Sequence, residues 1–97
     1  MSDPIAPNRK RLHLVISGLV QGVGFRYSTQ VQARQWGIVG WVRNLSDGRV
    51  EAALEGEPED LDRLVKWCRQ GPPAAQVRDV TIEEEKPQGD REFEILH

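Results

Sequence analysis

Cysteine is almost absent from the chain, whose 97 residues include only Cys68. A single cysteine cannot form a disulfide within the chain. Without a CxxC pair, the sequence offers neither a cysteine zinc site nor a dithiol redox centre. Cys68 falls on the apolar side of a predicted helix, so we expect a buried thiol with a packing role.

Long apolar runs are also missing. A membrane-spanning helix needs about 18 consecutive apolar residues, and a secretory signal needs an apolar stretch near the N-terminus. Neither pattern occurs here. We therefore expect a cytoplasmic protein that makes no membrane contact.

The chain lacks an excess of positive charge. It has 13 Lys and Arg residues against 15 Asp and Glu residues, and a formal net charge of -2. Domains that bind nucleic acid usually carry a basic excess or a basic face, because they neutralise phosphates. The composition therefore argues against a nucleic-acid partner, although it leaves a local basic patch open as an alternative.

The chain length fits one compact domain, since two domains of this total size would each have too small a core. Residues 1–9 contain two prolines and mostly polar side chains. We expect a flexible N-terminal tail over 1–9 and a single domain over 10–97.

Hydrophobic periodicity predicts an α+β fold. Apolar residues alternate over 10–17, 49–56, 77–85 and 91–96, which predicts strands, and a fifth strand is predicted over 37–44 because that segment is rich in Ile, Val and Trp. Helical spacing appears over 25–36 and from 57 to the Gly71-Pro72-Pro73 stop. The order β-α-β-β-α-β, with a short extra C-terminal strand, is typical of a ferredoxin-like α/β sandwich. Right-handed crossovers then put both helices on one face of an antiparallel sheet.

The stretch SGLVQGVGFRYS, residues 17–28, is the first candidate site. Gly18, Gly22 and Gly24 fall between a predicted strand and a predicted helix, and Arg26 follows in the first helical turn. Unpaired N–H groups at a helix N-terminus can bind an anion, and arginine pairs with phosphate oxygens. The stretch lacks the P-loop and dinucleotide fingerprints. A plain turn with a solvated Arg26 therefore remains the alternative to an anion cradle.

Asn44 is the second candidate, because asparagine is uncommon in strands. It can initiate the turn that follows, or its amide can hold a water or a phosphoryl oxygen. His13 and the run Glu83–Glu85 are weaker candidates. We expect His13 to be structural, and the glutamates to be a solvated strand end instead of a metal site.

Four blocks of the sequence resemble the acylphosphatase family. SGLVQGVGFR resembles the family loop G-x-V-Q-G-V-x-F-R, and GIVGWVRNLSDGRVEAALEG resembles its G-x-x-G-W-V-x-N-x-x-D-G-x-V hairpin. WCRQGPPAAQV and VRDVTIEEE resemble the segment after the second helix and the fourth strand. With the ending REFEIL, the resemblance covers about residues 11–97, and its first two blocks are specific.

The resemblance implies hydrolysis of the carboxyl-phosphate bond of acyl phosphates to carboxylate and inorganic phosphate, by direct attack of water. It assigns the catalytic roles to Arg26 and Asn44. It assigns phosphate binding to the backbone N–H groups of the loop, namely Gln21, Gly22, Val23, Gly24, Phe25 and Arg26. We expect a monomer whose partners are a small acyl phosphate and inorganic phosphate as product or competitor. We expect no metal and no cofactor. A carboxylate leaving group needs no general acid, which fits the absence of a catalytic histidine or a paired-carboxylate motif from the sequence.

Two positions depart from the family pattern. Leu45 stands where some members carry threonine, which puts a hydrogen bond near the attacking water in doubt, and Gly24 stands where others carry cysteine. The alternative function is a non-catalytic ferredoxin-like module that binds RNA or a regulatory ligand. An RNA-recognition domain needs aromatic side chains on its third strand, and RVEAALEG has none.

Overall fold

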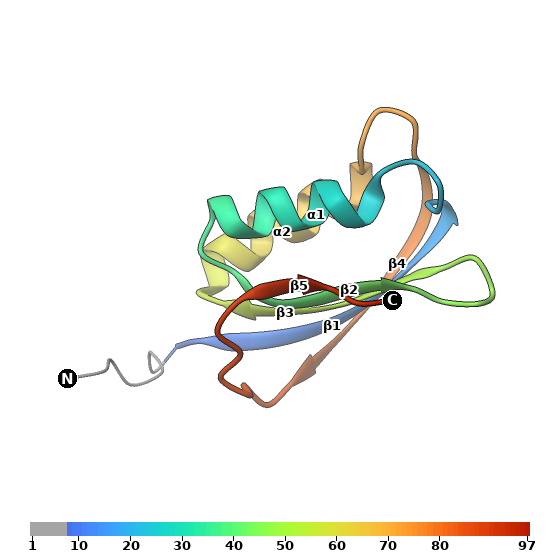
Figure 1. Cartoon of the computed structure of the whole chain (residues 1–97). Coiled ribbons are helices and arrows are strands. Elements are labelled where there is room, and N and C mark those ends of the chain that lie inside the picture. Colours follow the sequence, from blue (N-terminus) through green and yellow to red (C-terminus); the bar gives the residue numbers. More distant parts are fainter. Residues whose placement is uncertain (1–7) are drawn as a thin grey trace.

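Two helices lie on one face of a five-stranded sheet in the computed structural model, which describes residues 8–97 (Figure 1). The elements are β1 (Lys10–Leu19), α1 (Phe25–Gln35), β2 (Val39–Asn44), β3 (Val50–Gly56), α2 (Pro58–Gln70), β4 (Gln76–Glu85) and β5 (Phe93–Ile95). This order confirms the predicted ferredoxin-like α/β sandwich. Residues 1–7 of the predicted tail lie outside the described residues, so the division into a tail and a domain over 10–97 stays a prediction.

Helix α1 packs on the sheet through the side that its spacing predicts. Phe25, Thr29 and Ala33 are buried. Thr29, a polar residue on this side, donates its hydroxyl hydrogen to the backbone oxygen of Phe25 at 2.7 Å. The buried hydroxyl therefore has a partner, and the face can enter the core without an unpaired polar group.

Helix α2 begins at Pro58 and carries Glu59 and Asp60 in its first turn, where negative charge suits the helix dipole. Leu64 and Cys68 are fully buried. Burial raises the pKa of the Cys68 thiol to about 12, so the thiolate does not form near neutral pH. The predicted packing role of Cys68 is confirmed. No helix within residues 8–97 is both long and apolar enough to cross a bilayer.

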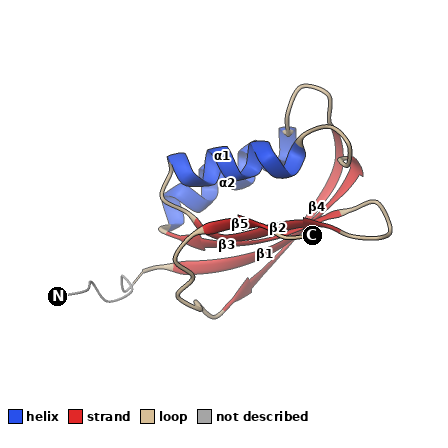
Figure 2. Cartoon of the chain, viewed as in Figure 1, coloured by secondary structure: helices blue, strands red, loops and turns tan. Residues whose placement is uncertain are grey.

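The strands form a layer beneath the two helices (Figure 2), and their order across the sheet is β4-β1-β3-β2-β5. Strands β1 to β4 pair antiparallel as predicted, whereas β5 pairs parallel with β2, so the sheet is mixed. The reason is the connection over 86–92. It runs from one sheet edge to the other beneath the face that the helices leave open, so β5 starts at the end of the sheet where β4 stops (Figure 1).

A buried carboxylate holds this connection against the sheet. Glu55 of β3 is 0% exposed and accepts hydrogen bonds from the backbone N–H groups of Gln88, at 2.7 Å, and Gly89, at 2.9 Å. It also accepts one from Arg11 Nη1 at 3.0 Å. Burial alone would raise the pKa of Glu55, but these three donors and the positive charge of Arg9, whose Nε lies 3.1 Å from Glu55 Oε2, outweigh it and hold the pKa below the ordinary value.

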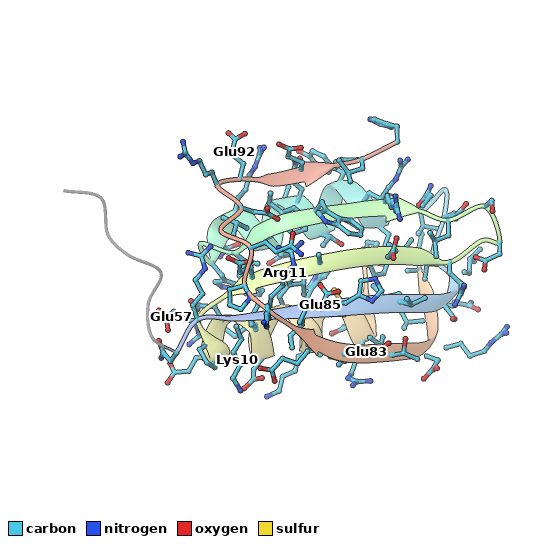
Figure 3. The ribbon with its side chains drawn as sticks, turned by 90° about the horizontal axis from the view of Figure 1, so that it is seen from below. Lys10, Arg11, Glu57, Glu83, Glu85 and Glu92 are labelled. Atoms are coloured by element: carbon cyan, nitrogen blue, oxygen red, sulfur yellow. The ribbon has the colours of Figure 1, made fainter. Side chains whose placement is uncertain are left out.

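Arg11 completes the cluster from the neighbouring strand. Its guanidinium is 2.9 Å from Asp90 Oδ2 and 3.3 Å from Glu85 Oε1, so it joins β4 and the connection to β1. Figure 3 shows the open face, with Arg11 where the connection crosses the sheet and Glu85 beside it. The charges are paired and hydrogen-bonded, which offsets much of the cost of removing them from water.

Replacing Glu55 with alanine should lower the free energy of unfolding by about 3 kcal/mol at pH 7. The change leaves two backbone N–H groups without an acceptor and removes a buried partner of Arg11. Urea unfolding followed by circular dichroism measures the loss. Glu83→Ala is the control, because Glu83 is exposed and forms no ion pair within residues 8–97. We expect that control to stay within about 0.5 kcal/mol of wild type, and equal losses in the two variants would contradict the anchoring role.

Comparing wild type with Glu55→Ala at different pH values tests how the contribution of Glu55 to stability depends on pH. The folded-state pKa of Glu55 lies below its unfolded value of about 4.3. Its ionised form therefore stabilises the fold above that pH, and the contribution is lost as the pH falls through the folded pKa. The stability difference between wild type and Glu55→Ala should shrink in acid, whereas a difference that grew toward pH 3 would refute the assignment.

Candidate active site

The loop over residues 20–24 joins β1 to α1 through two residues with left-handed backbone. Gly22 has a φ of 73° and Gly24 a φ of 80°. A Cβ atom at either position would meet no atom within 4 Å, so backbone direction and not space requires glycine. Left-handed residues between ordinary ones turn successive N–H groups toward one side, which is the backbone pattern of an anion-binding nest.

The N–H groups of this loop have no partner within the described part of the chain. No hydrogen bond among residues 8–97 uses the backbone N–H of residues 21–27 as its donor. Gly24 is the N-cap of α1 and has no side chain to cap the first turn. These unpaired donors lie at the positive end of the helix dipole, so they can bind an anion.

Arg26 adds a full positive charge to the same turn. The first turn of α1 contains no acidic residue. Among residues 8–97, the Arg26 guanidinium takes part in no ion pair. A free cation beside unpaired N–H groups makes the potential here positive, which favours an anionic ligand.

Asn44 faces this turn from the end of β2. Strand alternation puts its side chain on the face of Val42, which is fully buried under the helices. Its Oδ1 atom is buried and has no hydrogen-bond partner among the described residues. A buried amide oxygen without a partner carries a free-energy cost, so it is a ready acceptor for a water or ligand hydrogen.

A pocket of about 230 Å³ brings these groups together. It is smaller than the roughly 300–1,000 Å³ of pockets that take drug-sized ligands, so it suits a small molecule. Its lining comes from the loop, the first turn of α1, the end of β2 and the segment after β5: Val20, Gly22, Gly24, Phe25, Arg26, Tyr27, Asn44, Ile95 and His97.

Most of the predicted site residues line this pocket, and two do not. Gly22, Gly24, Phe25, Arg26 and Asn44 are part of its wall. Val23 instead packs against the hydrophobic core. Gln21 also lies outside the wall, and its side-chain amide donates to the backbone oxygens of Leu45, at 2.7 Å, and Arg49, at 2.9 Å. The phosphate-binding role of their backbone N–H groups stays a prediction.

Four residues of the wall were not predicted. Val20 and Tyr27 flank the expected loop residues, so a wider window around the loop would have included them. Ile95 and His97 reach the pocket because β5 runs parallel to β2 toward the end that carries Asn44, with Ile95 paired to Val42. No local signal in the sequence announces this pairing, because it depends on the crossing of residues 86–92.

The weaker candidates lie elsewhere. His13 is on the opposite face of the sheet from Leu14, and its Nε2 is 2.6 Å from Glu51 Oε2. Burial alone would raise the pKa of Glu51, but His13 and Arg43 outweigh it, and the pKa is lowered. Glu83–Glu85 belong to β4, and residues 8–97 contain no cluster of three side chains that could hold a metal ion.

The family model and the relatives of similar sequence point to one family. Residues 12–95 match the family model described as Acylphosphatase. A protein of Acaryochloris marina named acylphosphatase is 58% identical over 90 residues, which are 93% of this chain and 97% of that protein. An acylphosphatase of Trichormus variabilis is 56% identical over 85 residues, 88% of this chain and 84% of the relative.

The solved structures show the same fold. The crystal structure of an acylphosphatase from Bacillus subtilis superposes with a TM-score of 0.89 at 36% sequence identity, and the match covers 91% of this chain and 99% of that one. An acylphosphatase from Coxiella burnetii also gives a TM-score of 0.89, at 38% identity. The match covers 92% of this chain and 94% of that one.

Gly24→Ala should weaken the binding of inorganic phosphate about tenfold, which corresponds to about 1.4 kcal/mol. The substitution strains a residue with a φ of 80° and turns the N–H groups of the loop away from a common point. Titration calorimetry measures the affinity. Gly48→Ala is the matched control, since Gly48 has a φ of 97° in the β2–β3 turn and equal space around it. Both variants should lose about 1 kcal/mol of stability. A loss of phosphate affinity in both, or in neither, would count against an anion site at Gly24.

Proposed function

The chain belongs to the acylphosphatase family, and we propose that its pocket hydrolyses the carboxyl-phosphate bond of small acyl phosphates to carboxylate and inorganic phosphate. The observation that carries the proposal is the pairing, in one pocket, of unpaired loop N–H groups and Arg26 with the unpartnered Oδ1 of Asn44. The loop N–H groups and Arg26 bind an anion, and the Oδ1 of Asn44 accepts a hydrogen from water. Family membership favours hydrolysis over the RNA-binding or regulatory alternative.

The loop and Arg26 bind the phosphoryl group. In the proposed mechanism, backbone N–H groups of residues 21–26 donate to its equatorial oxygens, and Arg26 forms charge-assisted hydrogen bonds to the same oxygens. Negative charge on these oxygens is redistributed in the transition state. Donors that are already in place stabilise that charge without a reorganisation cost.

Asn44 positions the nucleophile. Its Oδ1 accepts a hydrogen from a water and holds the water oxygen in line with the carboxyl-phosphate bond. A bond forms between this oxygen and phosphorus while the bond to the acyl oxygen breaks. The electron pair of the broken bond leaves with the carboxylate. One proton of the water passes to a phosphoryl oxygen, and the other stays on the attacking oxygen.

The leaving group explains why the site needs so few side chains. A carboxylate is a weak base, so it departs without a proton from a general acid. Phosphoryl transfer then depends on positioning and on charge stabilisation, which the loop, Arg26 and Asn44 would supply. We propose on this chemical ground that the reaction requires neither a metal ion nor a cofactor.

We further propose that the enzyme acts as a monomer in the cytoplasm. The loop, Arg26 and Asn44 all come from one chain, so the pocket is complete without a second copy. Cys68 is a buried free thiol, which is compatible with a reducing compartment. The substrate is the small acyl phosphate, and inorganic phosphate is both product and competitor.

Arg26→Ala should lower kcat/KM for benzoyl phosphate by about 1,000-fold or more, because it removes the only side-chain charge on the phosphoryl group in this mechanism. The assay follows hydrolysis with and without a metal chelator, and wild-type turnover should survive chelation. Arg69→Ala, an exposed arginine at the end of α2, should keep wild-type rates. Wild-type protein that leaves benzoyl phosphate intact would overturn the proposed function.

Asn44→Ala should lower kcat about 100-fold, the usual effect of removing one positioned hydrogen-bonding group. Phosphate should still inhibit with an affinity within about threefold of wild type, since the loop and Arg26 stay in place. Asn8→Ala serves as the control, because Asn8 is exposed and does not line the pocket. Loss of phosphate binding with unchanged turnover of bound substrate would show that Asn44 binds substrate and does not position water.

A further inference from the structure

We infer that Gln21 is a positioning residue, which sets the spacing between the phosphate-binding loop and Asn44 through its side-chain amide. The inference rests on the proposed function, and it goes beyond the backbone role expected for this residue. The observation that carries it is a pair of hydrogen bonds from one amide group to the two ends, Leu45 and Arg49, of the turn that joins β2 and β3.

Both hydrogens of the Gln21 amide are used. Nε2 donates to the backbone oxygen of Leu45 at 2.7 Å and to that of Arg49 at 2.9 Å. These two acceptors belong to the last rung of the β2–β3 hairpin, where the Leu45 N–H donates to the Arg49 oxygen at 2.8 Å. The amide therefore binds the end of the hairpin as a unit instead of touching one strand.

The bonds join segments that the sheet connects only through β3, whose ladder with β1 ends at the pair of Ile16 and Val50. The loop continues from β1, and Asn44 ends β2, but β3 lies between these strands in the order β4-β1-β3-β2-β5. No ladder hydrogen bond can therefore connect the loop directly to β2. Among the described residues, the two bonds of Gln21 are the only hydrogen bonds between residues 20–24 and residues 44–49.

Each end of this hydrogen-bonded bridge is next in the sequence to a part of the proposed active site. Gln21 precedes Gly22, where the left-handed turns of the loop begin, and Leu45 directly follows Asn44. A shift of the hairpin relative to the loop would move the amide of Asn44 relative to the bound phosphoryl group. Catalysis by positioning is sensitive to such shifts, since a displacement of about 1 Å can reduce a rate about 100-fold.

Glutamine fits this role for a chemical reason. The role needs two donors on one nitrogen and no charge, because the acceptors are neutral carbonyls. Methionine has similar length and shape but no donor. Ionised glutamate offers only acceptors, which two carbonyl oxygens would repel, whereas a protonated glutamate offers one donor.

The experiment compares wild type, Gln21→Met and Gln21→Glu in benzoyl phosphate hydrolysis, with phosphate inhibition measured in parallel. Gln21→Met should lower kcat about 10- to 100-fold and leave the phosphate inhibition constant within about threefold. The kcat of Gln21→Glu relative to wild type should rise as the pH falls and the carboxyl gains its proton. Gln35→Met is the matched control, because Gln35 is exposed at the end of α1.

Three results would overturn the inference. One is a folded Gln21→Met protein with a kcat within twofold of wild type. Another is a loss of phosphate affinity as large as the loss of kcat, which would put Gln21 in the cradle itself. The third is solvent exchange of the Gln21 side-chain amide that is as fast as that of Gln35. NMR measures this exchange on the wild-type protein, so the result does not depend on the folding of a variant. Wild-type protein without hydrolytic activity would instead refute the proposed function.

Discussion

The buried carboxylate of Glu55 is the interaction on which the arrangement of the C-terminal third depends. Strands β4 and β5 lie at opposite edges of the sheet, so the chain between them must cross a face that no helix covers. Glu55 supplies that path with a charged acceptor for two backbone N–H groups and for Arg11. Because the crossing is held there, β5 can run parallel to β2, and Ile95 and His97 reach the pocket at the far end.

The two faces of the sheet thus serve different purposes. The helix face holds an apolar core in which nearly every side chain is fully buried, and this core fixes the direction of α1. Phe25 begins that helix from within the core and packs on Trp67 with ring centroids 5.5 Å apart. The unpaired N–H groups of the first turn are therefore attached to a rigid element, while the glycines before it supply the turn that such an attachment requires.

Much of the fold and of the candidate site could be predicted from the sequence. The features that could not be predicted depend on contacts between distant segments. Element order and the buried side of α1 follow from periodicity, which is a local property. The parallel pairing of β5 and the burial of Glu55 are not local. Alternation puts Glu55 on the open face, where a glutamate would ordinarily stay hydrated, and only the later segment with Gln88 and Gly89 covers it. Likewise, the motif identifies Gln21 as part of the loop, but its side-chain partners belong to a hairpin more than twenty residues away.

The proposed chemistry requires Asn44 and Arg26 to be placed with different accuracy, although the site contains few side chains. Asn44 is uncharged, so it can contribute only through where it holds a water, and that contribution vanishes if the position is lost. Arg26 is charged and acts over a longer range, so a small displacement costs it less. The hairpin that carries Asn44 must therefore be placed more strictly than the turn that carries Arg26. The ladder from β1 reaches this hairpin through β3 and ends at the pair of Ile16 and Val50. A side-chain amide bridging two carbonyls beyond that pair, at the end of the hairpin, therefore meets this requirement.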